Sequence, residues 1–253
     1  MAERFVLHEV FGNEDTDPIP LGIRIGNVVH ASRITGVDPV TGVLADGIDA
    51  QMAAVHQNVR QVVERAGGSI DNIAQVSFFV AQREYLQAIN PPWVQLFPND
   101  DDRPTYKFMV ANLPAGVLVQ AEMFAVLGAR RELIHVPGVA HTNPIPMGVK
   151  IGGMVFSSRI LPFEPATGKP PEGLAAQAEV VFGNLRTFLT NAGAEPRHIS
   201  QARIFIADKA EMPVIQQHWD QLFAGVAHRP VMHAVTYGAG TALQAYIEIV
   251  AVL

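Results

Sequence analysis

Hydrophobic and polar positions follow two different periods in the first half of the chain. Apolar and polar residues alternate, with β-branched enrichment, in "GIRIGNVVHASR" (22–33), which predicts strands joined by a hairpin, and "DPVTG" after it supplies turn chemistry. The stretch 49–66 instead carries apolar residues at helical spacing and ends at Gly67-Gly68, which predicts a helix with its C-cap there. The predicted buried face of this helix contains Met52, Val55, Val59, Val62 and Val63.

The rest of this half alternates between the same two element types. "IAQVSFFVA" (73–81) is typical of a buried strand, and "REYLQAINPPWVQLF" (83–97) of a second helix broken by its two prolines. "KFMVANL" (107–113) and "VLVQAEMFAVL" (117–127) predict two more strands. The predicted order is therefore ββαβαββ.

The whole pattern occurs twice in the sequence. With a constant shift of 126 residues and no gap, "PIPLGIRIG" (18–26) falls on "PIPMGVKIG" (144–152) and "WVQLF" (93–97) on "WDQLF" (219–223), and about a third of the aligned positions are identical. A period this long indicates a duplicated domain rather than a solenoid. We therefore predict an α+β protein of two tandem modules, repeat 1 (1–127) and repeat 2 (128–253), each a sheet with two helices on one face.

Composition and charge narrow the functional classes. The 253 residues are 49% apolar and 17% charged, which is typical of an ordinary globular protein. A net charge of −6 without any Lys/Arg run argues against nucleic acid as a partner, and the absence of Cys excludes thiolate sites. "MAERFVLHEV" lacks the features of a secretory signal and no apolar run approaches the roughly 20 residues of a membrane helix. We expect a cytoplasmic protein without membrane contact.

The ordered set of short motifs resembles the YjgF/Rid family, the reactive intermediate deaminases, once per repeat. The motifs are an "IGNxVxxS"-like strand, a "DPxTG"-like turn, a helix with "Q…N", an "AG" cap, a "W…LF" helix, an "RP" and a closing "E…AVL" strand. The resemblance implies a chorismate-mutase-like fold, trimers with ligand clefts between modules, and hydrolysis of reactive enamines and imines to ketones and ammonia. An older family name is L-PSP endoribonuclease.

The family's site residues carry over only in part. Its S-G-Q-[IL]-P motif corresponds to "ASRIT" (31–35) and "SSRIL" (157–161), so that Arg replaces Gln at Arg33 and Arg159, and the first Ser survives only as Ser157. At the remaining family positions, the residue of repeat 1 is given before that of repeat 2. The clamp arginine corresponds to Thr105 and Val231, the cysteine to Lys107 and His233, and the tyrosine to Ile19 and Ile145. The first carboxylate corresponds to Gln120 and Tyr246, and the second is retained as Glu122 and Glu248. The resemblance therefore implies a site without the usual clamp.

The paired arginines have two interpretations. Arg33 and Arg159 would supply the guanidinium that the missing clamp no longer provides, and so select an anionic substrate. Alternatively, each pairs with a nearby carboxylate or covers apolar surface with its stem, and Glu122 and Glu248 are then the natural partners. A repeat retains structural and functional residues alike, so both interpretations stay open.

Other polar residues are candidates as well. Arg103 and Arg229 precede Pro near the clamp strand and are either substrate ligands or solvated turn residues. Lys107 would bind a carboxylate, and His233 would move a proton. His30, His141 and His228 differ between the repeats and are expected at the surface or in a satisfied core. No spacing of His and carboxylates is typical of a metal site, and we expect no metal and no cofactor.

Two functional hypotheses follow. In the first, a small anionic enamine, imine or related C–N compound binds at an inter-module cleft, where Arg33, Arg159 or Lys107 holds its charge and Glu122, Glu248 or His233 activates water. In the second, the protein is a non-catalytic metabolite-binding or scaffold protein of the same fold. If modules assemble in threes, three chains supply six modules and fill two rings, which predicts a homotrimer that is a pseudo-hexamer.

Overall fold

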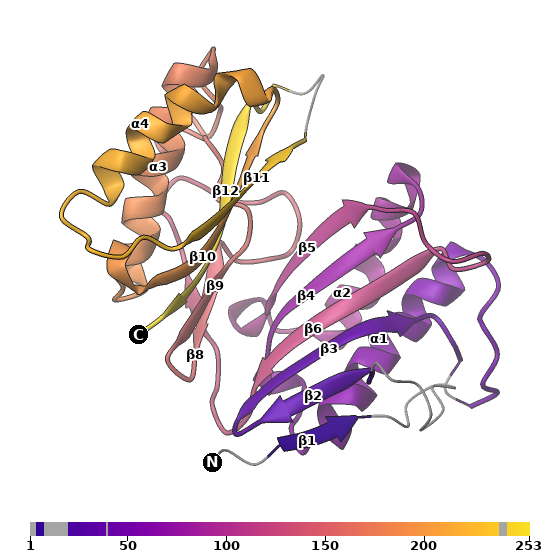
Figure 1. Cartoon of the computed structure of the whole chain (residues 1–253). Coiled ribbons are helices and arrows are strands. Elements are labelled where there is room, and N and C mark those ends of the chain that lie inside the picture. The colour runs from indigo at the N-terminus through magenta and orange to yellow at the C-terminus, as the bar shows by residue number, and fades with distance from the viewer. Residues whose placement is uncertain (1–3, 8–19, 39, 238–241) are drawn as a thin grey trace. The chain divides into compact units, whose positions relative to one another are not determined.

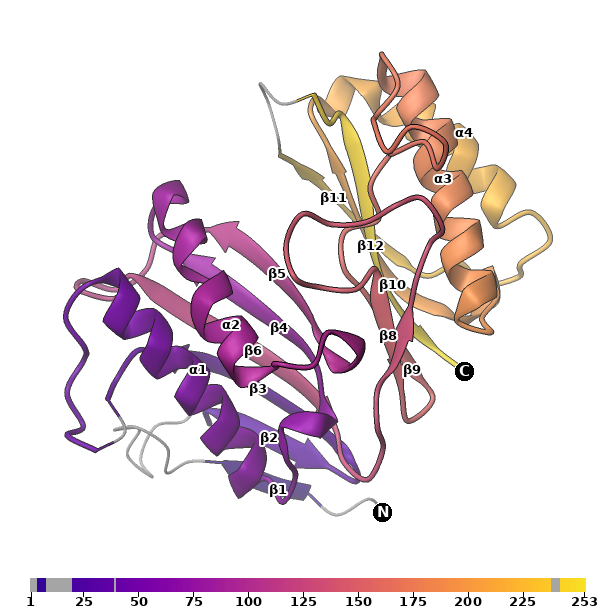
Figure 2. The same cartoon turned by 180° about the vertical axis from the view of Figure 1, so that it is seen from behind.

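The chain folds as two compact units, described by a computed structural model that covers residues 4–7, 20–38, 40–237 and 242–253. Unit 1 is Met1–Arg131 and unit 2 is Glu132–Leu253. Within the described residues each unit contains one six-stranded sheet. Each unit also has two α-helices, which cover one face of its sheet (Figures 1 and 2). The α+β class that we predict for both repeats is thereby confirmed.

Unit 1 has the strand order β1-β2-β3-β6-β4-β5, in which only β4 and β5 run parallel. Its elements are β1 (Arg4–Leu7), β2 (Gly22–Ile25), β3 (Val28–Thr35), α1 (Ile48–Arg65), β4 (Ile73–Val80), α2 (Asn90–Leu96), β5 (Thr105–Val110) and β6 (Val119–Val126).

Unit 2 repeats this arrangement in the order β11-β10-β12-β9-β8-β7, with β10 and β11 parallel. Its elements are β7 (Glu132–Ile134), β8 (Gly148–Ile151), β9 (Met154–Ser157), α3 (Leu174–Asn191), β10 (Ile199–Ile206), α4 (Met212–Leu222), β11 (Val231–Thr236) and β12 (Ala245–Val252). The predicted order ββαβαββ lacks the first strand of each unit, β1 and β7, which pair antiparallel with the hairpins that follow.

Local sequence explains the helices. The five apolar residues predicted for the buried face of α1 are all at most 1% exposed. The helix ends because Gly67 adopts a φ of 87°, which glycine reaches without steric cost. The expected second helix is divided: a 3₁₀ turn spans Arg83–Ala88, and α2 begins at Asn90, so that its prolines lie in the first turn rather than in the helix interior.

In both units an asparagine of the first α-helix forms hydrogen bonds to the segment that leaves the hairpin. The Nδ2 of Asn58 in α1 donates to the carbonyls of Thr35 and Val37, both at 2.8 Å. Asn184 in α3 donates likewise to Leu161 at 2.8 Å and Phe163 at 2.9 Å. Because each amide satisfies two carbonyls of the segment leaving the hairpin, the repeat retains Asn at both positions.

Aromatic side chains fill the space between helices and sheet in unit 1. Trp93 of α2 is fully buried, with its ring centroid 5.1 Å from Tyr106 and 6.1 Å from Phe78. His56 of α1 lies in the same cluster, only 3% exposed and stacked 5.1 Å from Phe78. The face of the sheet that these rings cover is therefore the core, and the opposite face remains for other contacts.

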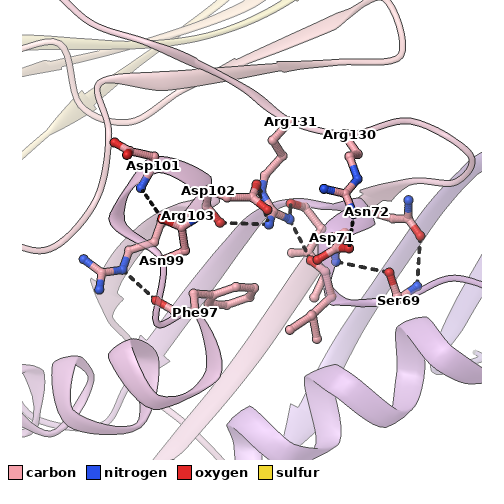
Figure 3. A network of polar contacts seen from close by, with 12 residues as sticks. Ser69, Asp71, Asn72, Phe97, Asn99, Asp101, Asp102, Arg103, Arg130 and Arg131 are labelled. Carbon is pink, nitrogen blue, oxygen red and sulfur yellow. Dashed lines mark hydrogen bonds and ion pairs between the residues drawn. The ribbon is translucent and has the colours of Figure 1, made fainter.

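A buried arginine closes unit 1 at its last residue (Figure 3). The Nη1 of Arg131 donates to the carbonyls of Ile70 at 2.6 Å and Ile73 at 2.9 Å, and its Nη2 to that of Asp102 at 2.9 Å. Its Nε donates to the Asp102 carboxylate at 3.0 Å, and its guanidinium lies 5.6 Å from the centre of the Phe97 ring. One planar group thus joins three loops of unit 1.

Replacement of this arginine provides the first prediction. Arg131→Met removes a side chain that is 1% exposed and leaves three carbonyls and Asp102 without their donor, so the free energy of unfolding should fall by about 3 kcal/mol. Arg130→Met is the matched control, because the Arg130 side chain is 80% exposed and its pair with Asp71 spans 3.4 Å. Equal urea midpoints for the two variants would contradict this role.

The second prediction concerns pH. Burial lowers the pKa of His56 from 6.5 to about 4. The unfolded chain therefore protonates this imidazole at higher pH than the folded chain does, and stability should fall as pH drops from about 6.5 to about 4 while staying level above. His56→Phe, which introduces the residue found at position 182, should reduce the slope by up to roughly 1.4 kcal/mol per pH unit. Denaturation curves across this range test it, and an unchanged slope would contradict it.

Candidate functional site

Two candidate residues of unit 1, Lys107 and Glu122, belong to one row across the sheet face opposite the helices. Ser77 of β4 is paired with Lys107 of β5 on one side and with Glu122 of β6 on the other. Side chains alternate between the faces of a strand, and Phe78 points to the helices, so Ser77 and its two partners point away from them. Thr105 and Gln120 lie on this same face by register, since they pair with Gln75 and Phe79.

Unit 2 contains the corresponding row. Arg203 of β10 is paired with His233 of β11 and with Glu248 of β12. Glu248 is 3% exposed, and its carboxylate lies 3.3 Å from the Nε of Arg159 and 3.9 Å from the Nη1 of Arg203. A buried carboxylate thus lies between two guanidinium groups, which compensates the cost of removing its charge from water. The pairing of Arg159 with Glu248 is the one that the structural interpretation of the sequence expects.

Three aromatic rings surround Arg159. Its guanidinium carbon lies 5.5 Å from the ring centre of Phe205, 5.4 Å from that of Tyr237 and 5.1 Å from that of Tyr246. Phe205 and Tyr246 stack on each other at 4.7 Å. Each ring face attracts the cation, so this arrangement fixes the orientation of the guanidinium beside Glu248. We call Arg159, Glu248, Arg203 and the three rings the cation box.

Arg33, the counterpart of Arg159, has a different conformation. Its φ is 57°, the one positive φ at a non-glycine residue in the described part of the chain, and it lies in a register shift between Ala31 and Ile34. The Nη2 of Arg33 is 3.5 Å from the carbonyl of Pro20. The left-handed conformation costs an L-residue about 1–2 kcal/mol, so the backbone of unit 1 is strained at this position.

Two other candidates form bonds within the sheet. Thr105, at the clamp position, is fully buried, and its hydroxyl accepts from the Gln75 side chain at 2.9 Å. The Ser157 hydroxyl is also buried and accepts from the backbone N–H of Ile249 at 2.7 Å. The clamp counterpart Val231 lies on the edge strand β11 and is 69% exposed. Thr105 and Ser157 therefore take part in the packing of the sheet.

The two arginines that precede proline have separate roles. The Nε of Arg103 donates to the carbonyl of Phe97 at 2.7 Å (Figure 3). Its Nη1 lies 2.5 Å from Asp100. Arg103 thus binds the carbonyl end of α2. Arg229 pairs at the surface with Asp220 of α4.

A histidine-serine pair lies next to the box in sequence. The Nε2 of His141 is 2.6 Å from the Ser158 hydroxyl, which donates to the carbonyl of Met147 at 2.8 Å. Burial, with a smaller effect of the Arg159 charge, lowers the pKa of His141 to about 4, so the ring is neutral at pH 7. Ser158 has no exposed surface, which makes this pair a bridge between loop and strand rather than an accessible nucleophile.

Sequence reasoning missed Arg203, Phe205 and Tyr237 because the resemblance to the family does not mark these positions. A signal was present: the alternation of "ISQARIFI" (199–206) places Arg203 and Phe205 on one face of β10, away from the apolar core. The sequence does not predict which residues pair across the sheet, because residues 203, 233 and 248 are brought together only by the order of the strands.

Over the described ranges, no three His, Asp or Glu side chains are grouped so that they could hold a metal ion. In the same part of the chain, no helix is both long and apolar enough to cross a membrane.

Comparisons with known proteins match each half of the chain. A family model described as Endoribonuclease L-PSP matches residues 19–127 and again 139–253. A 2-iminobutanoate/2-iminopropanoate deaminase of Salmonella typhimurium is 30% identical over 111 residues, which cover 43% of this chain and 87% of that protein. A RutC family protein of Aquifex aeolicus is 30% identical over 115 residues, 43% of this chain and 92% of its own. The crystal structure of RidA from an Antarctic Psychrobacter has a TM-score of 0.45 and 24% identity, and covers 49% of this chain and 100% of that one.

The strain at Arg33 gives a third prediction. Arg33→Gly and Arg33→Ala both remove the side chain, but only glycine adopts a φ of 57° without cost. The glycine variant should therefore be about 1 kcal/mol more stable than the alanine variant in urea denaturation. The same pair of substitutions at Arg159, whose φ is not positive, should favour alanine or be equal. A preference for alanine at position 33 would contradict the assigned backbone conformation.

Proposed function

Because the chain belongs to the endoribonuclease L-PSP family, the Rid family, we propose that it hydrolyses a small, anionic enamine, imine or related C–N compound and releases ammonia. Family matches over 19–127 and 139–253 and the deaminase named among its relatives support this reaction class. The location of the site between modules, which the family resemblance implies, stays a prediction.

One observation carries the proposal: unit 2 collects two guanidinium groups, a buried carboxylate and three aromatic rings, and three of these groups, Arg159, Tyr246 and Glu248, stand at positions that correspond to the family site. Arg203, whose side chain is 41% exposed, is accessible to a substrate carboxylate. Arg159 adds its positive charge to the site from a fixed position, since Glu248 and the rings hold its guanidinium. The rings exclude water beside the reacting group and so strengthen these electrostatic contacts.

The reaction requires water and no other reagent. Glu248 orients a water molecule whose oxygen adds to the imine carbon, and the C–N bond then breaks, so that R₂C=NH and H₂O give R₂C=O and NH₃. An enamine first takes up a proton at carbon and loses one from nitrogen, and so becomes the imine. His233, in register with Arg203 on an exposed edge strand, transfers the proton that the departing nitrogen needs.

The site differs from the standard family site. Thr105 stands at the clamp position in unit 1 and bonds to Gln75, and Val231 stands there in unit 2. Loss of a charge-assisted bond to a carboxylate costs about 1.5–3 kcal/mol. We therefore propose that simple 2-aminoacrylate-type substrates turn over more slowly here than in family members that retain the clamp.

A second candidate function is the binding of an anionic metabolite without catalysis. The low exposure of Arg159 (14%) and Glu248 (3%) favours it, because a buried carboxylate already paired with two guanidinium groups has little surface left for contact with a reacting water. This alternative keeps the ligand class and removes the chemical step.

The fourth prediction separates the two functions. Ammonia release from a panel of carboxylated imines and enamines should fall about tenfold or more in Arg203→Ala and Glu248→Gln, because these remove the carboxylate ligand and the group that orients water. Arg229→Ala is the matched control, since this arginine pairs with Asp220 at the surface. Binding by calorimetry without ammonia release would support the second candidate. If no compound of the panel binds and none releases ammonia, both functions are contradicted.

The fifth prediction is the oligomeric state. Strands β5 and β11 each end a sheet, and Val110 and Val231 on them are 43% and 69% exposed. Open sheet edges with apolar side chains favour pairing with another chain. We expect a homotrimer with a mass near three times 27.4 kDa by light scattering after size exclusion. A stable monomer at micromolar concentration would contradict it.

A further inference from the structure

A buried serine next to Arg159 links that arginine to the loop before β8. Ser158 lies directly before Arg159 in the chain and has no exposed surface. Its N–H and its hydroxyl both donate to the carbonyl of Met147, at 2.9 and 2.8 Å. On the other side of Arg159, Ile160 and Ile247 exchange two backbone hydrogen bonds, at 2.7 and 3.1 Å. The side chain of Arg159 therefore leaves the backbone between two residues whose positions are fixed.

His141 completes this link as a hydrogen-bond donor. The carbonyl of Met147 only accepts, so the hydroxyl proton of Ser158 points at it, and the lone pairs of the hydroxyl oxygen remain for His141. The Nε2 of His141 lies 2.6 Å from that oxygen, so Nε2 carries the proton of the ring. The ring is neutral at pH 7, because burial and, to a smaller extent, the charge of Arg159 hold its pKa at about 4. A neutral donor stands beside Arg159 without adding a further positive charge to those of Arg159 and Arg203.

Unit 1 contains the same Ser-Arg pair in a different conformation. The N–H of Ser32 donates to a backbone carbonyl at 2.8 Å, as in unit 2, but Ser32 is partly exposed. Arg33 then adopts a φ of 57°, whereas the φ of Arg159 is not positive. The residue aligned with His141 is Asp15, which lies outside the described residues and whose ionised carboxylate has no proton to donate. The difference between the two arginines thus accompanies the bond to the serine hydroxyl, since the backbone bond of the serine is the same in both units.

We propose that His141 is a positioning residue for the site in unit 2 and acts through the Ser158 hydroxyl. The bond keeps Arg159 in an ordinary backbone conformation, with its guanidinium against Glu248 and the rings of the cation box. A guanidinium that leaves this place no longer adds its charge to the binding of a substrate carboxylate. This role in turnover rests on the proposed function, whereas the placement of the guanidinium does not.

The placement of Arg159 is tested without any substrate. Its Nε–H donates to Glu248 at 3.3 Å beside three rings, so its ¹H–¹⁵N resonance should differ from that of a solvated arginine and is assigned by its loss in Arg159→Lys. His141→Leu removes the donor and Ser158→Ala the hydroxyl, and each should shift this resonance towards the solvated value. His141→Gln retains an N–H donor and should reverse most of the shift. His135→Leu, at an exposed histidine of the same loop, is the control. An unchanged resonance in His141→Leu would overturn the proposal.

Turnover distinguishes positioning from a general structural role. For a carboxylated imine, His141→Leu should lower kcat/KM about tenfold, chiefly through KM, because the fixed charge of Arg159 is lost. The methyl ester of the same imine, which lacks the negative charge, should lose much less, and His141→Gln should recover most of the activity on the acid. Equal losses on acid and ester would count against positioning. If the unmodified protein releases no ammonia from any imine, the proposed function is contradicted, and the resonance of Arg159 alone decides on His141.

The unmodified protein provides a further test, which also holds if His141→Leu and Ser158→Ala do not fold. At pH 7 the ¹⁵N shifts of the two ring nitrogens of His141 should identify the neutral tautomer with the proton on Nε2. A proton on Nδ1 instead would make Nε2 an acceptor. The Ser158 hydroxyl, which donates to Met147, could not serve it, and the proposal would fail.

Discussion

The alternation of side chains along the central strands is the constraint on which the rest of this structure depends. In β4, β6, β10 and β12 every second side chain enters a core covered by two helices, so the intervening side chains all lie on the other face. A slip of one residue in any of these strands would expose the core and bury the charges. Register therefore positions the functional side chains and stabilises the fold at the same time.

The two units share the residues that hold helices and loops together, and they differ on the sheet face opposite the helices, here called the open face. Asn58 and Asn184 bind the same pair of carbonyl positions in the two units, and the helix caps coincide. On the open face the aligned positions differ: Ser77 against Arg203, Gln120 against Tyr246. Bonds to backbone carbonyls leave little freedom for substitution, because a lost partner remains buried, whereas the open face tolerates a change of chemistry.

Two arginines with little exposure show how differently the chain holds a guanidinium. Arg131 is held mainly by backbone carbonyls, and its role is to join loops. Arg159 is held by the Glu248 carboxylate and three ring faces, and it keeps that carboxylate beside Arg203. Arginine serves in both places because its planar fork spreads one charge over five donors and two flat faces, which lysine lacks.

The sequence alone determined the repeat, the α+β class, the helix α1 with its buried face and cap, and the family. Periodicity and caps act within a few residues, so a single chain displays them. It also identified Arg159 and Glu248, but it left open whether they meet and passed over Arg203, Phe205 and Tyr237. Only the tertiary structure decided those points. It alone also shows the strained backbone at Arg33 and the buried His56 Nε2 that has no hydrogen-bond partner among the described residues. Strand order and register bring together residues tens of positions apart, and the contacts of a side chain across a sheet or between helices leave no mark in local sequence.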